Sequence, residues 1–128
     1  MKKTIKTQFL TSFFNLFGAE VKITKVDGNN VIYGTLSWKG EDDKQDFKWS
    51  NYFNKEALII LKKTCDFILK NNLNKGDRIL ISENVLRKKL IKYGWTYGDA
   101  EKGIEYLMLI NIKMIDDGEE TDSFFFHF

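Results

Sequence analysis

The spacing of the apolar residues changes twice along this chain, and each change indicates a different secondary structure. Within residues 5–17 the apolar side chains recur at intervals of three and four, which is the period of a helix with one buried face. Residues 20–26 alternate apolar and polar side chains, the sequence Asp-Gly-Asn-Asn at 27–30 favours a turn, and residues 31–38 are the expected returning strand of a β-hairpin. From residue 54 onward the helical period returns. We therefore expect an α+β protein that begins with a helix and a β-hairpin or meander.

The composition requires the chain to be stabilised by its own hydrophobic core. At 128 residues and 15.0 kDa, folding buries roughly two thirds of the surface of the unfolded chain. A lone Cys65 and a lone His127 exclude an internal disulfide and a structural zinc site. The acids at 42, 43 and 46 lack the ligand spacing of a calcium loop, and no phosphate-binding glycine loop or nucleophile–base pair is recognisable. We expect no catalysis, no cofactor and no metal.

The N-terminus combines three lysines with a phenylalanine-rich segment. Lys2, Lys3 and Lys6 precede that segment, which resembles a secretory signal only loosely because polar residues interrupt it. No apolar run approaches the ~20 residues of a membrane span. We expect a soluble, cytoplasmic protein without a membrane partner, although a helix lying on a membrane surface has a similar composition.

Residues 54–128 divide into three helices, a short strand and a hairpin. Asn54 is the expected N-cap of the first helix, which ends near residues 71–72 and is followed by a strand at 78–81. Ser82 caps a second helix that ends at Gly94, and Thr96 caps a third. Strands at 112–115 and 123–128 pair across a loop at 116–122. The residues expected to face inward are Ala57, Leu58, Leu61, Cys65, Ile68 and Leu69 in the first helix. In the second helix they are Leu86, Leu90 and Tyr93, and in the third they are Ala100, Ile104, Leu107 and Met108.

This order of elements, together with the residues of the tight turn, resembles the winged helix-turn-helix superfamily. The packing positions that carry the resemblance are Tyr93, Gly94, Trp95, Thr96, Ala100, Gly103, Ile104, Leu107, Asn111, Ile112 and Met114. The resemblance covers residues 54–128 as a winged-helix-like α-β-α-α-β-β unit and leaves the N-terminal helix and hairpin of residues 1–53 unmatched. We expect the two segments to form one compact unit.

The resemblance implies a small DNA-binding protein, such as a transcriptional regulator, with its third helix in the major groove and its second helix on phosphates. The candidate phosphate contacts are Arg87, Lys88 and Lys92, and the candidate groove contacts are Tyr97 and Lys102. A solvated helix face has the same charge pattern as this second helix. Regulators of this fold usually dimerise to span two half-sites, so residues 1–53 are the candidate homodimer element.

The C-terminal hairpin differs from the wing of a typical DNA-binding winged helix because it is strongly acidic. Its acids are Asp116, Asp117, Glu119, Glu120 and Asp122. An acid at ~4 Å from a phosphate costs about 1 kcal/mol even at the dielectric constant of water. The net charge of the whole chain is only +2, so it gives no general attraction to DNA. Either the second helix binds DNA with the wing turned away, or the protein is a non-catalytic inhibitor or adaptor whose acidic wing binds a protein partner.

Overall fold

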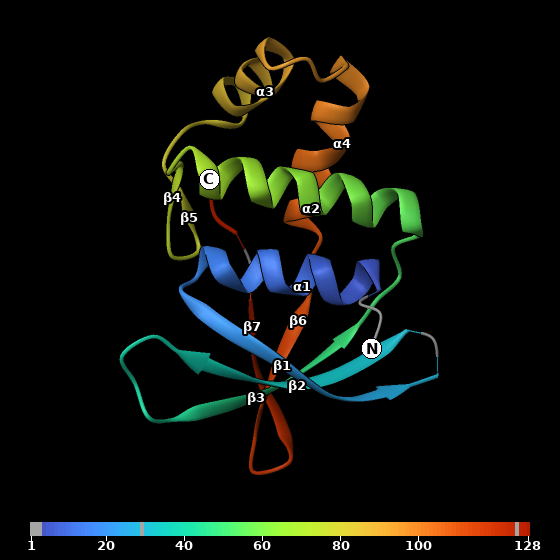
Figure 1. Ribbon diagram of the computed structural model, residues 1–128, viewed down its shortest axis with the longest axis vertical. Helices are drawn as coiled ribbons and strands as arrows, with labels where there is room; N and C mark the ends of the chain where they lie inside the picture. Colours follow the sequence, from blue (N-terminus) through green and yellow to red (C-terminus); the bar gives the residue numbers. More distant parts are fainter. Residues whose placement is uncertain (1–3, 29, 125) are drawn as a thin grey trace.

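The computed structural model describes residues 4–28, 30–124 and 126–128, with the backbone alone at 122–124. Within them, helices stack on one side of a five-stranded antiparallel sheet, and a two-stranded hairpin lies beside the helices (Figure 1). The mixed α and β architecture predicted from the sequence is confirmed. In chain order the elements are α1 (Ile5–Leu16), β1 (Ala19–Asp27), β2 (Val31–Trp38), β3 (Lys44–Ser50), α2 (Lys55–Lys70), β4 (Asn74–Lys75), β5 (Arg78–Ile79), α3 (Glu83–Lys92), α4 (Tyr97–Met108), β6 (Ile112–Asp116) and β7 (Glu119–Phe124).

The sheet joins the N-terminal and C-terminal parts of the chain. Its strand order is β1-β2-β3-β6-β7, so the C-terminal hairpin continues the N-terminal meander. In the β3–β6 register, Phe47 pairs with Met114 and Trp49 pairs with Ile112. Residues from segments 1–53 and 54–128 thus contribute to the same sheet and to the same hydrophobic core.

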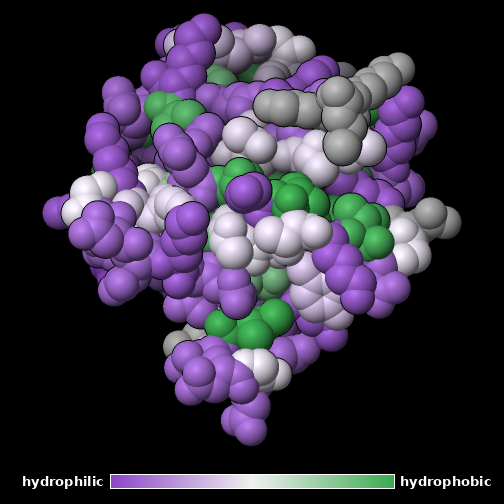
Figure 2. Space-filling view, turned by 60° about the horizontal axis from the view of Figure 1, so that its bottom comes forward, coloured by the Kyte–Doolittle hydropathy of each residue, from purple (hydrophilic) through white to green (hydrophobic). Residues whose placement is uncertain are grey.

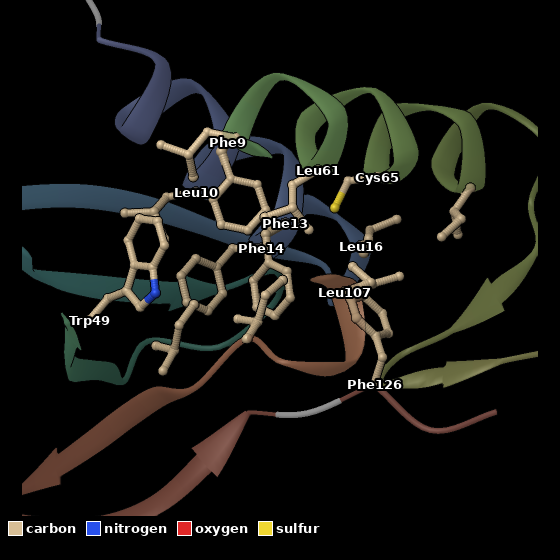
Figure 3. Close-up of a cluster of buried hydrophobic side chains, with 14 of the residues drawn as sticks. Phe9, Leu10, Phe13, Phe14, Leu16, Trp49, Leu61, Cys65, Leu107 and Phe126 are labelled. Carbon is tan, nitrogen blue, oxygen red and sulfur yellow. The ribbon is translucent and has the colours of Figure 1, made fainter. Parts of the chain in front are cut away.

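Helix α1 lies between the sheet and α2, and its phenylalanines fill the centre of the core (Figures 1 and 3). Phe9, Phe13 and Phe14 are fully buried, as the helical spacing predicts. The ring of Phe9 lies 5.3 Å from that of Trp49, and the ring of Phe13 lies 5.2 Å from that of Phe126, measured between centroids. Each fully buried side chain of this kind contributes roughly 1.5–3 kcal/mol. Among the described residues, no helix is long and apolar enough to cross a membrane.

The three predicted N-caps of the C-terminal helices are confirmed. The side chains of Asn54, Ser82 and Thr96 accept hydrogen bonds from backbone N–H groups three residues ahead, at 2.8, 3.2 and 3.1 Å. Each such bond satisfies a donor that has no partner within its helix, which stabilises the helix by about 1 kcal/mol. Gly94 has φ +102°, the backbone conformation predicted for the residue that ends α3.

Three of the expected inward residues are in fact exposed. Leu69 is 41% exposed on the last turn of α2. Tyr93 is 67% exposed because it caps the end of α3, where its ring packs edge-on against Phe67 on the surface. Met108 is 37% exposed on the last turn of α4. Gly103 is buried at the crossing of α2 and α4 instead, where a Cβ atom would collide with the hydroxyl oxygen of Thr64.

The predicted strand at 78–81 is shorter than expected. Only Arg78–Ile79 is a strand, and it pairs with Asn74–Lys75 in a tight hairpin. Arg78 also forms a parallel bridge with His127. The backbone N–H of Leu80 donates to the carbonyl of Leu73, so the pairing continues by one hydrogen bond beyond the strand, and α3 begins soon afterwards at Glu83.

The C-terminal hairpin also differs from its predicted boundaries. Its strands are joined by the two-residue turn Asp117-Gly118, in which both residues have positive φ, at 52° and 81°. An Asp-Gly pair accepts this turn at little cost, and the resulting register extends the strands through most of the expected loop. Phe126 leaves the hairpin and enters the core, where it is 6% exposed. The prediction of a strand over 123–128 is therefore wrong, because β7 spans Glu119–Phe124. Of the five acids, only Asp117 lies in the turn, and the other four belong to strands.

Candidate nucleic-acid interface

Helices α3 and α4 form a helix-turn-helix at one end of the molecule. The turn spans residues 93–96, and its backbone is fixed by a hydrogen bond of 3.1 Å from the N–H of Trp95 to the carbonyl of Leu90. Buried residues on both helices, Leu86 and Leu90 of α3 and Ala100 of α4, belong to the common core. This pair lies at the opposite end of the long axis from the turn between β6 and β7 (Figure 1).

The exposed side of α3 is basic. Leu86 and Leu90 define the buried side of the helix, and Lys88 and Lys92 are exposed one turn apart on the opposite side. Lys89 is also exposed, although it was not among the predicted site residues. Its spacing from Leu86 places it closer to the edge of the buried side, so the charge pattern alone gave no reason to select it.

The structure brings together two candidate residues from different helices. Arg87 of α3 is half-buried, and its guanidinium carbon lies 6.0 Å from the ring centroid of Tyr97, the first residue of α4. Its Nη1 donates to the side-chain oxygen of Asn84 at 2.6 Å. The Nε of Arg87 is buried and has no hydrogen-bond partner among the described residues. The guanidinium is thus oriented by a hydrogen bond and by a cation–π contact at the junction of the two helices.

Lys102 does not join this pair. It is exposed on α4, but five residues along a helix rotate it roughly 140° from Tyr97. Its neighbours on the same helix include the exposed acids Asp99 and Glu105. The predicted groove contacts are therefore divided between two sides of α4, and only Tyr97 is close to the basic helix.

The acids of the C-terminal hairpin lie far from this interface. Asp116, Asp117 and Glu119 are exposed at the far end of the long axis (Figure 1). Glu120 accepts a hydrogen bond of 3.2 Å from Lys48 of β3, and its charge raises the pKa of that lysine. The side chain of Asp122 lies outside the described residues. The turn of the acidic hairpin therefore does not adjoin the basic side of α3 (Figure 1).

In the part of the chain that the structure describes, the remaining reactive groups do not form a second site. Cys65 is fully buried, and burial raises the pKa of its thiol, which keeps it protonated and unreactive. The Nε2 atom of His127 lies 3.5 Å from the Oδ2 atom of Asp77 on the surface. Among the described residues, no group of three or more histidines, cysteines or acids is arranged to hold a metal ion.

Comparison with known proteins found no family model, no curated protein and no solved structure that matches this chain. The functional argument therefore rests on the geometry of the molecule.

Proposed function

We propose that the protein binds duplex DNA through α3 and the first turn of α4, using the surface formed by Lys88, Lys92, Arg87 and Tyr97. The observation that carries the proposal is the distance between the basic side of α3 and the acidic C-terminal hairpin. The basic side of α3 and the Arg87–Tyr97 pair occupy one end, and the exposed acids of the C-terminal hairpin occupy the other (Figure 1). A polyanion can approach the first end without meeting the second.

In this proposal the two lysines contact phosphates, which give most of the affinity and none of the sequence selectivity. Arg87 supplies a planar fork that suits a phosphate or the edge of a guanine. Tyr97 stands at the start of α4, the part of a recognition helix that reaches base edges. Because α4 also exposes Asp99 and Glu105, we expect few base contacts and modest sequence selectivity.

The proposal includes a winged-helix-like unit, a cytoplasmic location and a homodimer. Dimer formation through the N-terminal segment is supported by the position of β1 at one edge of the sheet, where unpaired backbone groups can pair with another strand. A dimer would present two copies of α3 to two half-sites.

The test is a fluorescence-anisotropy titration of a mixed-sequence duplex with the wild-type protein and an Arg87→Gln/Lys88→Gln/Lys92→Gln variant. At roughly 0.1 M salt, each lost phosphate contact should weaken binding by about tenfold. The matched control is Lys22→Gln/Lys39→Gln/Lys44→Gln, which removes the same charge from exposed positions on or next to the sheet. Equal affinities of the two triple variants would refute the assigned surface.

A protein partner is the second candidate, and the acidic hairpin favours it. Asp116, Asp117 and Glu119 are exposed at a projecting tip, which suits a basic protein surface (Figure 1). Absence of duplex binding by the wild-type protein at low salt would leave this candidate as the better one.

A further inference from the structure

A row of four side chains crosses the face of the sheet that points away from α1. The register pairs Lys25 of β1 with Tyr33 of β2, Tyr33 with Lys48 of β3, and Lys48 with Lys113 of β6. Successive side chains of a strand point to opposite faces, and the neighbours of Tyr33 in β2, Ile32 and Gly34, face the core. The row therefore lies on the outer face, and among the described residues no helix covers that face (Figure 1).

The row places like charges next to each other. Lys48 and Lys113 are directly opposite each other on neighbouring strands, an arrangement that destabilises a sheet. Glu120 offsets part of this repulsion through its ion pair with Lys48. At the other end of the row, the ammonium of Lys25 lies over the ring of Tyr33, 5.5 Å from its centroid. Three cations and one aromatic ring are thus held in line.

Apolar and weakly polar side chains lie near Tyr33 on the same face of the sheet. Val31 and Thr35 share its strand and its face, and Ile115 lies on the same face of β6; all three are half-buried. Figure 2, which brings this end of the molecule forward, shows a band of hydrophobic and weakly polar residues between hydrophilic ones. With strands about 4.8 Å apart, four side chains in line span about 14 Å.

We propose that this face binds single-stranded nucleic acid, with an unpaired base stacked on Tyr33 and phosphates beside Lys25 and Lys113. An aromatic ring on an open sheet can stack only on a base that is not enclosed in a duplex, and lysines in line suit a flexible polyanion. The acids of this face lie outside the row and repel phosphates, so the bound strand runs across the β-strands. These acids are Glu20, Asp27, Asp46 and Glu120.

The test is a titration of fluorescein-labelled oligo(dT) with the full chain at low and moderate salt. Replacing Tyr33→Ala should weaken binding about ten- to hundredfold because a stacked base is lost, and Tyr33→Phe should retain most of the affinity. Lys25→Gln/Lys113→Gln should weaken binding more than its matched control Lys22→Gln/Lys44→Gln, which changes the same charge on the same face but outside the row. Thermal melting of each variant verifies that it is folded.

This site is independent of the duplex site, and the same variants distinguish the two. Tyr33→Ala should leave duplex binding unchanged, and the Arg87→Gln/Lys88→Gln/Lys92→Gln variant should leave oligo(dT) binding unchanged. Absence of oligo(dT) binding by the wild-type protein, equal binding by the wild-type protein and Tyr33→Ala, or preferential binding of a polyglutamate peptide would overturn the proposal.

Discussion

Helices α1 and α3 have similar lengths but make very different contributions to the core. Six of the 12 residues of α1 are buried, whereas only two of the 10 residues of α3 are. α1 lies between the sheet and α2, and α3 lies at the end of the molecule against α4 (Figure 1). Helix α1 is therefore needed for the fold, whereas α3 leaves most of its surface available to a partner. The largest stability effects should arise in α1, and the largest effects on DNA binding in α3.

The greatest loss of stability is expected from Phe13→Ala in α1. This side chain is fully buried and contacts the rings of Phe14, Phe17 and Phe126, so its truncation leaves a cavity. The free energy of unfolding, measured with urea, should fall by about 3–5 kcal/mol. Ile91→Ala on the exposed side of α3 is the control, with an expected change within about 0.5 kcal/mol. Similar losses in the two variants would contradict the contrast between the helices.

A smaller loss is expected where α4 is attached to α2. Gly103→Ala should lower the free energy of unfolding by about 1–3 kcal/mol, because the added Cβ meets the hydroxyl oxygen of Thr64. The double variant Gly103→Ala/Thr64→Ala should recover part of this loss, as a double-mutant cycle can show. Strictly additive losses would mean that the helix crossing adjusts without strain.

Loss of an N-cap should loosen α3 locally. Ser82→Ala removes the hydrogen bond to the N–H of Val85, at a cost of about 1 kcal/mol. Since few core contacts hold α3, its amides should exchange hydrogen faster while those of α1 keep their protection. Equal acceleration in both helices would show that α3 opens only when the whole protein unfolds.

The smallest effect concerns the ion pair between Lys48 and Glu120. The hydrogen bond and the charge of Glu120 raise the pKa of Lys48 above its ordinary value of 10.5. A raised folded-state pKa means that this stabilisation is complete below the ordinary pKa of a lysine and is lost as the pH rises through the folded-state value. Unfolding curves of the wild-type protein and Glu120→Gln should therefore differ slightly at neutral pH and converge in strong alkali. Divergence in alkali would contradict the assigned cause.

Features set by neighbouring residues could be predicted from the sequence. The spacing of the phenylalanines located α1, and the short polar side chains of Asn54, Ser82 and Thr96 located three helix starts, because a cap depends on residues only three positions apart. The predictions that Leu69, Tyr93 and Met108 face inward were wrong. Periodicity predicts on which face of a helix a residue lies. It does not predict whether the element packed against that face extends as far as the last turn of the helix.

Features set by distant parts of the chain could not be predicted. Nothing in the sequence of β6 shows that it pairs with β3, and this pairing directs the acidic hairpin away from α3 (Figure 1). The contact between Arg87 and Tyr97 depends on how the turn at 93–96 orients the two helices. The row formed by Lys25, Tyr33, Lys48 and Lys113 requires the register of four strands, which the alternation within each strand leaves open.

Mapping the duplex-binding surface by amide chemical shifts tests the central claim most directly. A ¹⁵N-labelled sample would be titrated with a short mixed-sequence duplex at low salt. We expect the largest shift changes in residues 83–102 and none beyond the noise at 116–120. Changes concentrated at 116–120, or spread evenly over the surface, would contradict the assignment of DNA binding to α3 and the first turn of α4.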